Sequence, residues 1–274
     1  MRKNQQKITA NQGITADDWQ ELWQRRELLW VLVRRDLQVR YKNTALGVLW
    51  VILQPLLSAL LFTLIFAKVL HFDQGEANYL VSTFLGFMFW QFFSGSLTTG
   101  AQTIYEQIAM IKKIYFPRLY LPLTVVLRSL FDFFVSSCLL IIIMLWQKAG
   151  FSINGFIGFC LTIICLTIFA SGCSFIFASL NARYRDFRHL TPFVIQIWFY
   201  ATPVFYPASL LSGNLAWLGK INPLAHCLRL VRAAIFENQV FYHDFAWLFL
   251  ASILVWLAGV LLFKKMETEI VDWT

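Results

Sequence analysis

Long hydrophobic runs separated by short polar segments are the main feature of the chain. Six of them cover residues 45–67, 80–104, 119–146, 153–180, 190–205 and 245–263. Most approach or exceed the roughly 20 residues that a helix needs to cross a hydrocarbon core. The pattern predicts an all-α integral membrane protein with six transmembrane helices. The fifth run is the shortest and contains Pro192 and Pro203.

A helical stripe of apolar residues precedes the first run. Its members recur at intervals of three, four and seven: Trp19, Leu22, Trp23, Leu29, Trp30, Val33 and Leu37. Leu28, Val31 and Leu32 fall off this stripe, and Arg26 lies on it. Three tryptophans among arginines suit an amphipathic helix in the headgroup layer. A helix in the cytosol is the alternative.

Residues inside the runs indicate how the helices pack. Pro55 in the first run removes one backbone hydrogen bond, so we expect that face to point into protein or a cavity that satisfies the freed carbonyl. Small residues at 94–101 and at Ala170, Ser174, Ala178 and Ala182 allow close helix approach. Helix packing is the simpler interpretation of these small residues, and a substrate path is the other.

The polar segment at 203–244 contains a second kind of helix. Asn222-Pro223 supplies a start, and the apolar residues that follow at helical spacing are Leu224, Cys227, Leu228, Val231 and Ile235. This helix is too short to span a bilayer, and another apolar piece at 210–218 precedes it. We therefore predict re-entrant or interfacial helices between spans five and six. Asn222, Pro223, Arg229 and Arg232 are candidates for an external gate.

Composition and charge support these predictions. Of the 274 residues, 58% are hydrophobic and 14% are charged, which excludes an ordinary soluble protein. Seventeen of the 23 Lys and Arg lie in the N-terminal arm, in the loops after spans two and four, and in the C-terminal tail. The positive-inside rule therefore places both termini in the cytoplasm. The net charge of +8 is explained by topology without nucleic acid as a partner.

Catalytic and metal-binding patterns are weak. The five cysteines form no CxxC pair, the four histidines do not gather at ligand spacing, and we predict no metal site. The segment 213–221 resembles a phosphate-binding loop, but its glycine spacing is wrong and it follows no strand. Residues 1–42 lack the apolar core of a signal peptide. Energy for active transport would therefore come from a partner.

One charged pair lies within a predicted span. Arg128 and Asp132 are one helical turn apart in the third run. Intramembrane charges are costly, and they usually face the bundle interior or water. The pair is either functional or a structural salt bridge, and Arg128 is alternatively close enough to the interface to snorkel.

Four blocks of the sequence resemble a known family. They are RRDLQVRYKNTALGVLWVILQPLLSALLFTLIF at 34–66, MIKKIYFPRLYLPL at 110–123, ATPVFYPASLL at 201–211 and INPLAHCLRLVRAAIF at 221–236. They are similar to the permease subunit of polysaccharide-exporting ABC transporters, closest to those for O-antigen and teichoic acid. The resemblance covers nearly the whole chain in the same order.

The resemblance implies a homodimer bound to two copies of an ABC ATPase subunit, which binds the ATP and Mg. It also implies a cytosolic coupling helix between spans two and three. Apolar anchors flanked by charge suit docking into a groove. The corresponding residues here are Ile108, Ile111, Lys112, Lys113, Ile114, Tyr115 and Phe116. An ordinary basic loop is the alternative.

Aromatic residues are abundant, with 27 Phe, 11 Trp and 9 Tyr. Aromatic faces stack on the C–H faces of sugar rings, and similar permeases line their channels with them. Candidate channel-lining residues are Phe87, Trp90, Trp198, Tyr200 and Phe205. Arg40 and Lys42 are candidate contacts for a pyrophosphate-linked lipid head, although topology alone accounts for their charge.

We therefore expect the channel-forming subunit of an exporter of lipid-linked polysaccharide in the bacterial inner membrane, without a nucleotide site or cofactor of its own. The expected divisions are an N-terminal arm at 1–43, a six-span domain at 44–265 and a tail at 266–274. An exporter of teichoic acid, capsule or another amphiphile is the alternative. A membrane-embedded glycan polymerase or acyltransferase would need clustered catalytic groups on the outer face, where the candidates are Arg229, Arg232, His226, Glu237, His243 and Asp244.

Overall fold

The computed structural model describes residues 16–42, 47–69, 76–146, 152–184, 186–207 and 216–272, and every regular element within them is helical. The elements are α1 (Ala16–Gln24), α2 (Arg26–Tyr41), α3 (Leu49–Thr63), the π-helix η1 (Leu64–Val69), α4 (Glu76–Glu106), α5 (Ile108–Ile111), α6 (Tyr120–Trp146), α7 (Ile153–Arg183), α8 (Phe187–Tyr200), α9 (Ala216–Ile221), α10 (Pro223–Phe236) and α11 (Tyr242–Asp272). The prediction of an all-α fold is confirmed.

Five helical segments in the described chain are long and apolar enough to cross a membrane. They are Leu49–Phe66, Tyr79–Glu106, Tyr120–Trp146, Ile153–Arg183 and Tyr242–Glu267. The run at 190–205 forms α8, which has 14 residues and extends about 21 Å, short of the roughly 30 Å hydrocarbon core. Pro203 disfavours helical backbone in the residue before it, and the chain continues from Tyr200 as turns. The sixth span stays a prediction.

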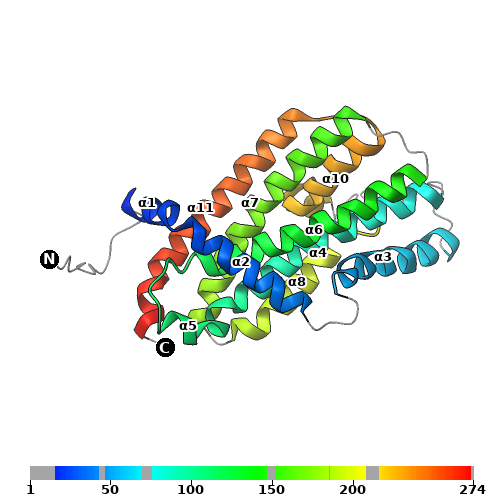
Figure 1. Ribbon diagram of the computed structural model, residues 1–274. Helices are drawn as coiled ribbons and strands as arrows, with labels where there is room; N and C mark the ends of the chain where they lie inside the picture. The colour runs from blue at the N-terminus through cyan, green and yellow to red at the C-terminus, as the bar shows by residue number, and fades with distance from the viewer. Residues whose placement is uncertain are drawn as a thin grey trace, which may run out of the picture.

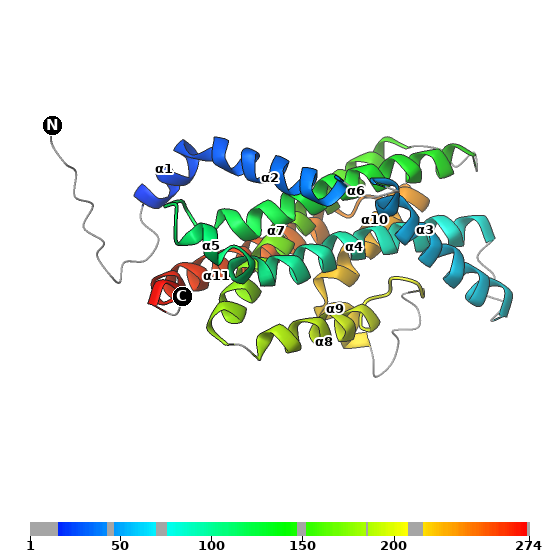
Figure 2. The same ribbon diagram turned by 60° about the horizontal axis from the view of Figure 1, so that its bottom comes forward.

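The long helices α4, α6, α7 and α11 run side by side, and α10 is inserted among α4, α7 and α11 (Figure 1). In contrast, α3 leans away from the bundle, and α2 runs along α6 at its edge, with α1 beyond it (Figure 2). The short α5 lies at the same end as α1 and the end of α11 (Figure 1). The chain therefore has a packed block with α3 and α8 at its margin.

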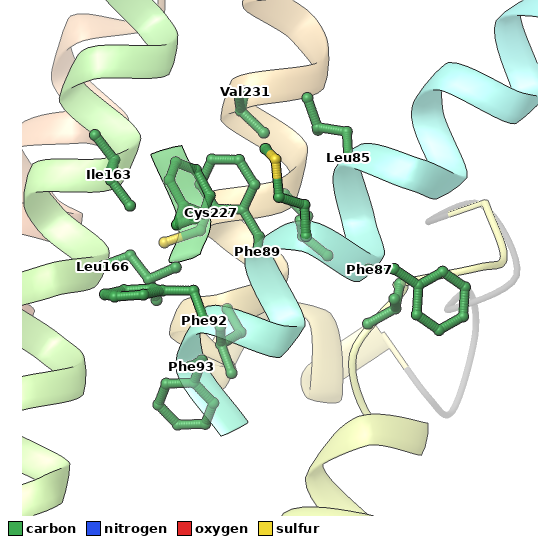
Figure 3. Packing of buried hydrophobic residues seen from close by; sticks show 14 of the residues in the cluster. Leu85, Phe87, Phe89, Phe92, Phe93, Ile163, Leu166, Cys227 and Val231 are labelled. Atoms are coloured by element: carbon green, nitrogen blue, oxygen red, sulfur yellow. The ribbon is translucent and has the colours of Figure 1, made fainter. Parts of the chain in front are cut away.

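Aromatic side chains of α4 fill the centre of the block. Phe89, Phe92 and Phe93 point toward α7 and α10, whereas Phe87 points to the other side of α4 (Figure 3). The Phe89 ring meets that of Phe133 edge-on at 4.9 Å between centroids, a geometry that aromatic quadrupoles favour. The core is thus built on one face of α4, which leaves its other face toward α3 and α8.

Glycines bring two pairs of helices, α7 with α11 and α4 with α7, into close contact. A Cβ on Gly172 would lie 2.6 Å from Trp256 of α11, and one on Gly259 would lie 2.4 Å from the Gly172 carbonyl oxygen. A Cβ on Gly100 would lie 1.9 Å from the Ser174 hydroxyl of α7. The stripe of small residues has Ala170, Ser174 and Ala178 buried and Ala182 partly buried. It serves helix packing, as its simpler interpretation predicted.

The kink residue Pro55 has the environment expected of it. Proline at this position leaves the Val51 carbonyl without its helical donor, and Ser136 of α6 donates its hydroxyl hydrogen to that oxygen at 3.1 Å. Pro55 is buried and faces a cavity between α3, α4 and α8. The prediction that protein would satisfy the freed carbonyl is confirmed.

The N-terminal stripe forms two helices that meet at Arg25. Leu32 and Val33 of α2 are buried against α6, whereas Trp23 and Trp30 are 71% and 63% exposed. Leu32 lies off the apolar stripe and is buried nevertheless, because α2 turns the Leu32–Val33 edge to α6. The exposed tryptophans match a helix whose outer face meets headgroups.

Candidate functional site

A polar cavity of about 380 Å³ lies between the end of α2, the first turns of α3, and the middles of α4 and α6. Residues from all four helices line it: Arg40, Tyr41, Gly47, Trp50, Val51, Gln54, Met88, Gln91, Phe92, Ser94, Gly95, Thr98, Thr99, Ser129, Asp132, Phe133 and Ser136. Most of these side chains are uncharged hydrogen-bonding groups or aromatic rings. We refer to it below as the polar cavity.

Two residues at the end of α2 close one side of the polar cavity. Arg40 forms an ion pair with Asp132 at 3.2 Å, and the Tyr41 hydroxyl donates a short hydrogen bond to the other carboxylate oxygen. Burial, and then the hydrogen bond with Asp132, raise the pKa of Tyr41 above its ordinary value. These contacts attach α2 to α6.

The predicted Arg128–Asp132 pair is absent from the described residues. Asp132 has Arg40 and Tyr41 as partners instead, and the buried Nε of Arg128 has no hydrogen-bond partner there. The spacing of one turn allows a contact but does not require one. A tertiary partner from α2 therefore replaces the local one.

A second cavity, of about 320 Å³, lies on the other side of the contact between α3 and α4. The Gln91 amide donates to the Gln54 side-chain oxygen at 2.8 Å, and both residues line both cavities. The lining of this second cavity also includes Pro55, Phe87, Trp90 and Phe199. The two cavities therefore share part of their lining, namely Gln54, Gln91 and Ser94.

Four of the five predicted channel-lining aromatics pack on one ring, that of Phe199; they are Phe87, Trp90, Tyr200 and Phe205. Phe87 is 8% exposed and packs on Phe199, and Trp90 also packs on Phe199. The Trp198 indole donates to Asn222 at 2.9 Å, and Phe205 packs on Phe62. Only Tyr200 among the five is largely exposed in the chain, at 61%. Phe87 and Trp90 lie at or beside the second cavity, where a lining role stays a prediction.

Asn222 joins the end of α8 to the start of α10. Its side-chain oxygen accepts from the Trp198 indole at 2.9 Å and from the Leu224 backbone N–H at 3.1 Å. Its amide nitrogen donates to the Ala201 carbonyl at 3.2 Å and to the Thr202 hydroxyl at 2.8 Å. The residue is thus both the N-cap of α10 and an anchor for the chain after α8.

Arg232 holds the same segment from the middle of α10. Its guanidinium donates to the carbonyl oxygens of Pro203 and Val204 at 2.7 Å each, and to that of Ser82 at 3.3 Å. Burial lowers the pKa of Arg232 to about 10, so the group remains protonated at neutral pH. A Cβ on Gly86 of α4 would lie 2.3 Å from the Val204 oxygen. We call this contact the Arg232 joint.

The other two predicted gate residues differ in their setting. Pro223 begins α10, at the position where proline fits a helix. Arg229 lies at the surface, where it pairs with Asp244 at 2.7 Å and approaches His226 at 3.5 Å. Three of the candidates for outer-face chemistry, Arg229, His226 and Asp244, therefore lie together. Arg232, another candidate, is part of the Arg232 joint instead.

The predicted coupling segment, 108–116, is only partly available to a partner. Lys112, Lys113, Ile114 and Tyr115 are exposed, whereas Ile108 and Ile111 are half-buried. Phe116 is 5% exposed. The expectation that Phe116 anchors a partner is therefore wrong, because its ring is already buried within the chain.

The same segment contacts the N-terminal helices. Arg25 donates to the Tyr115 carbonyl at 3.2 Å, and its guanidinium lies 5.3 Å from the Tyr115 ring centroid. Arg35 of α2 approaches the Met110 sulfur at 3.5 Å. On the other flank, Arg188 covers the ring of Tyr105 at 3.9 Å. The coupling segment is therefore in direct contact with α2 and with Arg25 before it.

The two candidate lipid-head residues are placed differently. Lys42 is exposed at the end of α2, whereas Arg40 is paired with Asp132 and its side chain is 42% exposed. Sequence reasoning missed the polar cavity between them and the bundle. The available signal was the hydroxyl-rich 94–99 segment, for which helix packing was the simpler interpretation and a substrate path the alternative.

Comparison with known proteins adds independent evidence. The family model described as "ABC-2 type transporter" matches residues 27–236. An O-antigen export system permease protein of Klebsiella pneumoniae is 30% identical over 88% of this chain and 92% of its own length. One from Myxococcus xanthus is 31% identical over 80% of this chain and 84% of its own. A polysialic acid transport protein of Escherichia coli is 22% identical over 76% and 81%.

Proposed function

The chain belongs to the ABC-2 type transporter family of membrane proteins, and from this we propose that it is the channel-forming subunit of an exporter of lipid-linked, O-antigen-like polysaccharide. It works as a homodimer in the bacterial inner membrane with both termini in the cytoplasm. Two copies of a separate ATPase subunit bind ATP and Mg and supply the energy.

The observation that carries this proposal is the length of the match. Relatives named O-antigen export permeases align over 80% or more of this chain and of their own length at about 30% identity. The apolar helices agree with a subunit that spans the membrane. The relative named as a polysialic acid transport protein aligns over three quarters of the chain, so a capsule-type polymer is the second candidate substrate.

Exposed apolar residues beside lysines support an ATPase-docking role for the end that carries α5. Ile114 and Tyr115 are 59% and 66% exposed, and Lys112 and Lys113 flank them. An apolar anchor with a charged rim suits docking in a groove of a partner. Contacts of α5 with α2 then carry the movement of the ATPase into the membrane domain.

Copurification with the partner ATPase subunit tests the proposal. We expect Ile114→Asp and Tyr115→Asp to lose the ATPase and cell-surface polysaccharide while the membrane subunit keeps its melting temperature. Ile153→Asp is the matched control, because Ile153 is 80% exposed at the start of α7, at the opposite end of the bundle. If both docking variants retained the ATPase and export, the docking role would be wrong.

For the lipid head, the proposal is that Lys42 and Arg40 meet a pyrophosphate at the headgroup layer. Lys42 is exposed, and the Arg40 side chain is 42% exposed while it keeps its ion pair with Asp132, so a phosphate outside the polar cavity can meet both cations. Substitution of both cations by Gln should reduce export in correctly inserted protein. Unchanged export would remove this role and leave the charge to topology.

A further inference from the structure

Three hydroxyl groups in the polar cavity lack hydrogen-bond partners within the described residues: those of Thr98, Thr99 and Ser129. Elsewhere in the bundle, Thr124 and Thr162 donate to the carbonyl one turn earlier at 2.7 Å. Hydroxyls that do not bond to their own helix are available to a ligand. The polar cavity therefore presents donors and acceptors beyond those that the fold uses.

Aromatic and amide groups share this wall. Trp50 is 54% exposed at the cavity, and the rings of Phe92 and Phe133 lie beside it. Gln54 and Gln91 bond to each other through one donor and one acceptor, so each amide keeps further hydrogen-bonding capacity. An apolar face next to several neutral polar groups matches a sugar ring, which has C–H faces and a hydroxyl edge.

The charges argue against an anionic occupant. Arg40 and Asp132 are the two charged side chains that line the polar cavity in the described chain, and they neutralise each other at 3.2 Å. Tyr41 bonds to the same carboxylate, and burial keeps it protonated. A phosphate would meet the Asp132 carboxylate with no unpaired cation in the lining. A neutral ligand has no such cost.

We propose that the polar cavity is a binding site for a single neutral sugar residue of the exported polymer. This inference rests on the proposed function, and it adds a subsite within each subunit. The volume of about 380 Å³ lies within the roughly 300–1,000 Å³ of small-molecule sites. The α2 contacts to Asp132 border the site, so movement of α5 through α2 changes access to it.

Two substitutions test the site without disturbing the fold. A Cβ on Gly95 would have Ser129 Oγ at 3.8 Å as its nearest neighbour, so Gly95→Leu extends into the cavity without a backbone clash. The double variant Thr98→Val/Thr99→Val keeps side-chain shape and removes two hydroxyls. Thr167→Val is the matched control, because its hydroxyl bonds to Ile163 on α7, outside the cavity.

The experiment is saturation-transfer NMR on the purified subunit with its ATPase in detergent. The probes are methyl glycosides of galactose, mannose, rhamnose and N-acetylglucosamine, with inorganic pyrophosphate as competitor. We expect transfer to at least one glycoside in the natural protein and in Thr167→Val. The double Val variant should bind about tenfold more weakly, as expected for two lost hydrogen bonds. Gly95→Leu should show no transfer.

Other results would overturn the proposal. These are no transfer to any glycoside in the natural protein, unchanged transfer in Gly95→Leu, or displacement by pyrophosphate, which would indicate an anion site. Gel filtration and melting temperature confirm that each variant is folded. Because binding is measured without export, loss of the site is distinguished from failure of the proposed function, which ATPase copurification and cell-surface polymer report.

Discussion

Gly86→Ala is a direct test of the Arg232 joint, because it adds one methyl group where α4 meets the chain after α8. The new Cβ would lie 2.3 Å from the Val204 carbonyl oxygen and 3.0 Å from a guanidinium nitrogen of Arg232. The carbonyl must move by about 1 Å to reach an ordinary contact of 3.4 Å. Arg232 opposes this movement through hydrogen bonds to the carbonyls of both Pro203 and Val204.

The magnitude follows from three effects. Overpacking costs about 1–3 kcal/mol, and loss of a hydrogen bond to a charged group costs about 1.5–3 kcal/mol. Alanine in a helix is favoured over glycine by about 0.5–1 kcal/mol. The net destabilisation is about 2–5 kcal/mol, which corresponds to a melting temperature lower by about 10 °C.

Gly95→Ala is the matched control on the same helix, since its Cβ would have no neighbour closer than 3.8 Å. At position 95 the only effect is the higher helix propensity of alanine over glycine. We therefore expect the melting temperature of Gly95→Ala to be about 1–3 °C higher than that of the natural protein. Thermal unfolding of both variants in one detergent, followed by light scattering, makes the comparison. If Gly86→Ala were as stable as Gly95→Ala, the close approach at the Arg232 joint would be wrong.

Three further predictions concern single contacts. Asn222→Ala should lower the free energy of unfolding by about 2–4 kcal/mol and shift the fluorescence emission of Trp198, because four hydrogen bonds are lost. Asn222→Asp keeps the two hydrogen bonds that the side-chain oxygen accepts, so it should cost less stability. Equal costs for the two variants would contradict this prediction. Ser136→Ala should lower the free energy of unfolding by about 1–3 kcal/mol, because it leaves the Val51 carbonyl unpaired. Adding Pro55→Ala restores a backbone N–H for that carbonyl and should recover most of the lost stability. Additive effects of the two substitutions would refute the hydrogen bond between Ser136 and Val51. The natural protein should lose stability above pH ~10, because Tyr41 keeps its proton in the folded state at a pH where an unfolded tyrosine has lost it. The melting temperature of Tyr41→Phe should therefore fall less steeply with pH than that of the natural protein. Identical slopes would contradict the raised pKa of Tyr41.

Hydropathy was sufficient to find the long helices, because each must expose about 20 apolar residues to lipid. The run at 190–205 shows its limit. A hydropathy window does not register that the helix stops at Tyr200, nor that Arg232 holds the following carbonyls from 28 residues further along the chain. Such a contact depends on how α8 and α10 meet, which local composition does not encode.

Neither the location of the polar cavity nor the pairing of its charged residues was predicted from the sequence. The spacing of Arg128 and Asp132 suggested a local pair, but Asp132 is paired with Arg40, 92 residues away in sequence. Similarly, Tyr115 and Phe116 are adjacent aromatics, yet the first is exposed and the second buried. The direction of each side chain is set by neighbouring helices, which the apolar pattern of one segment does not define. The satisfaction of the Val51 carbonyl was predictable because proline imposes it on any fold.

The glycine crossing of α7 and α11 has a mechanical consequence. At Gly172 and Gly259 the two backbones touch without intervening side chains, so the helices cannot slide past each other without steric overlap. They must move as one rigid body. By contrast, only 17% of the apolar window of α3 is buried, against 67% of that of α4. The α7–α11 pair is therefore a rigid part of the bundle, and α3 has the smallest buried share of the five apolar windows in the described chain.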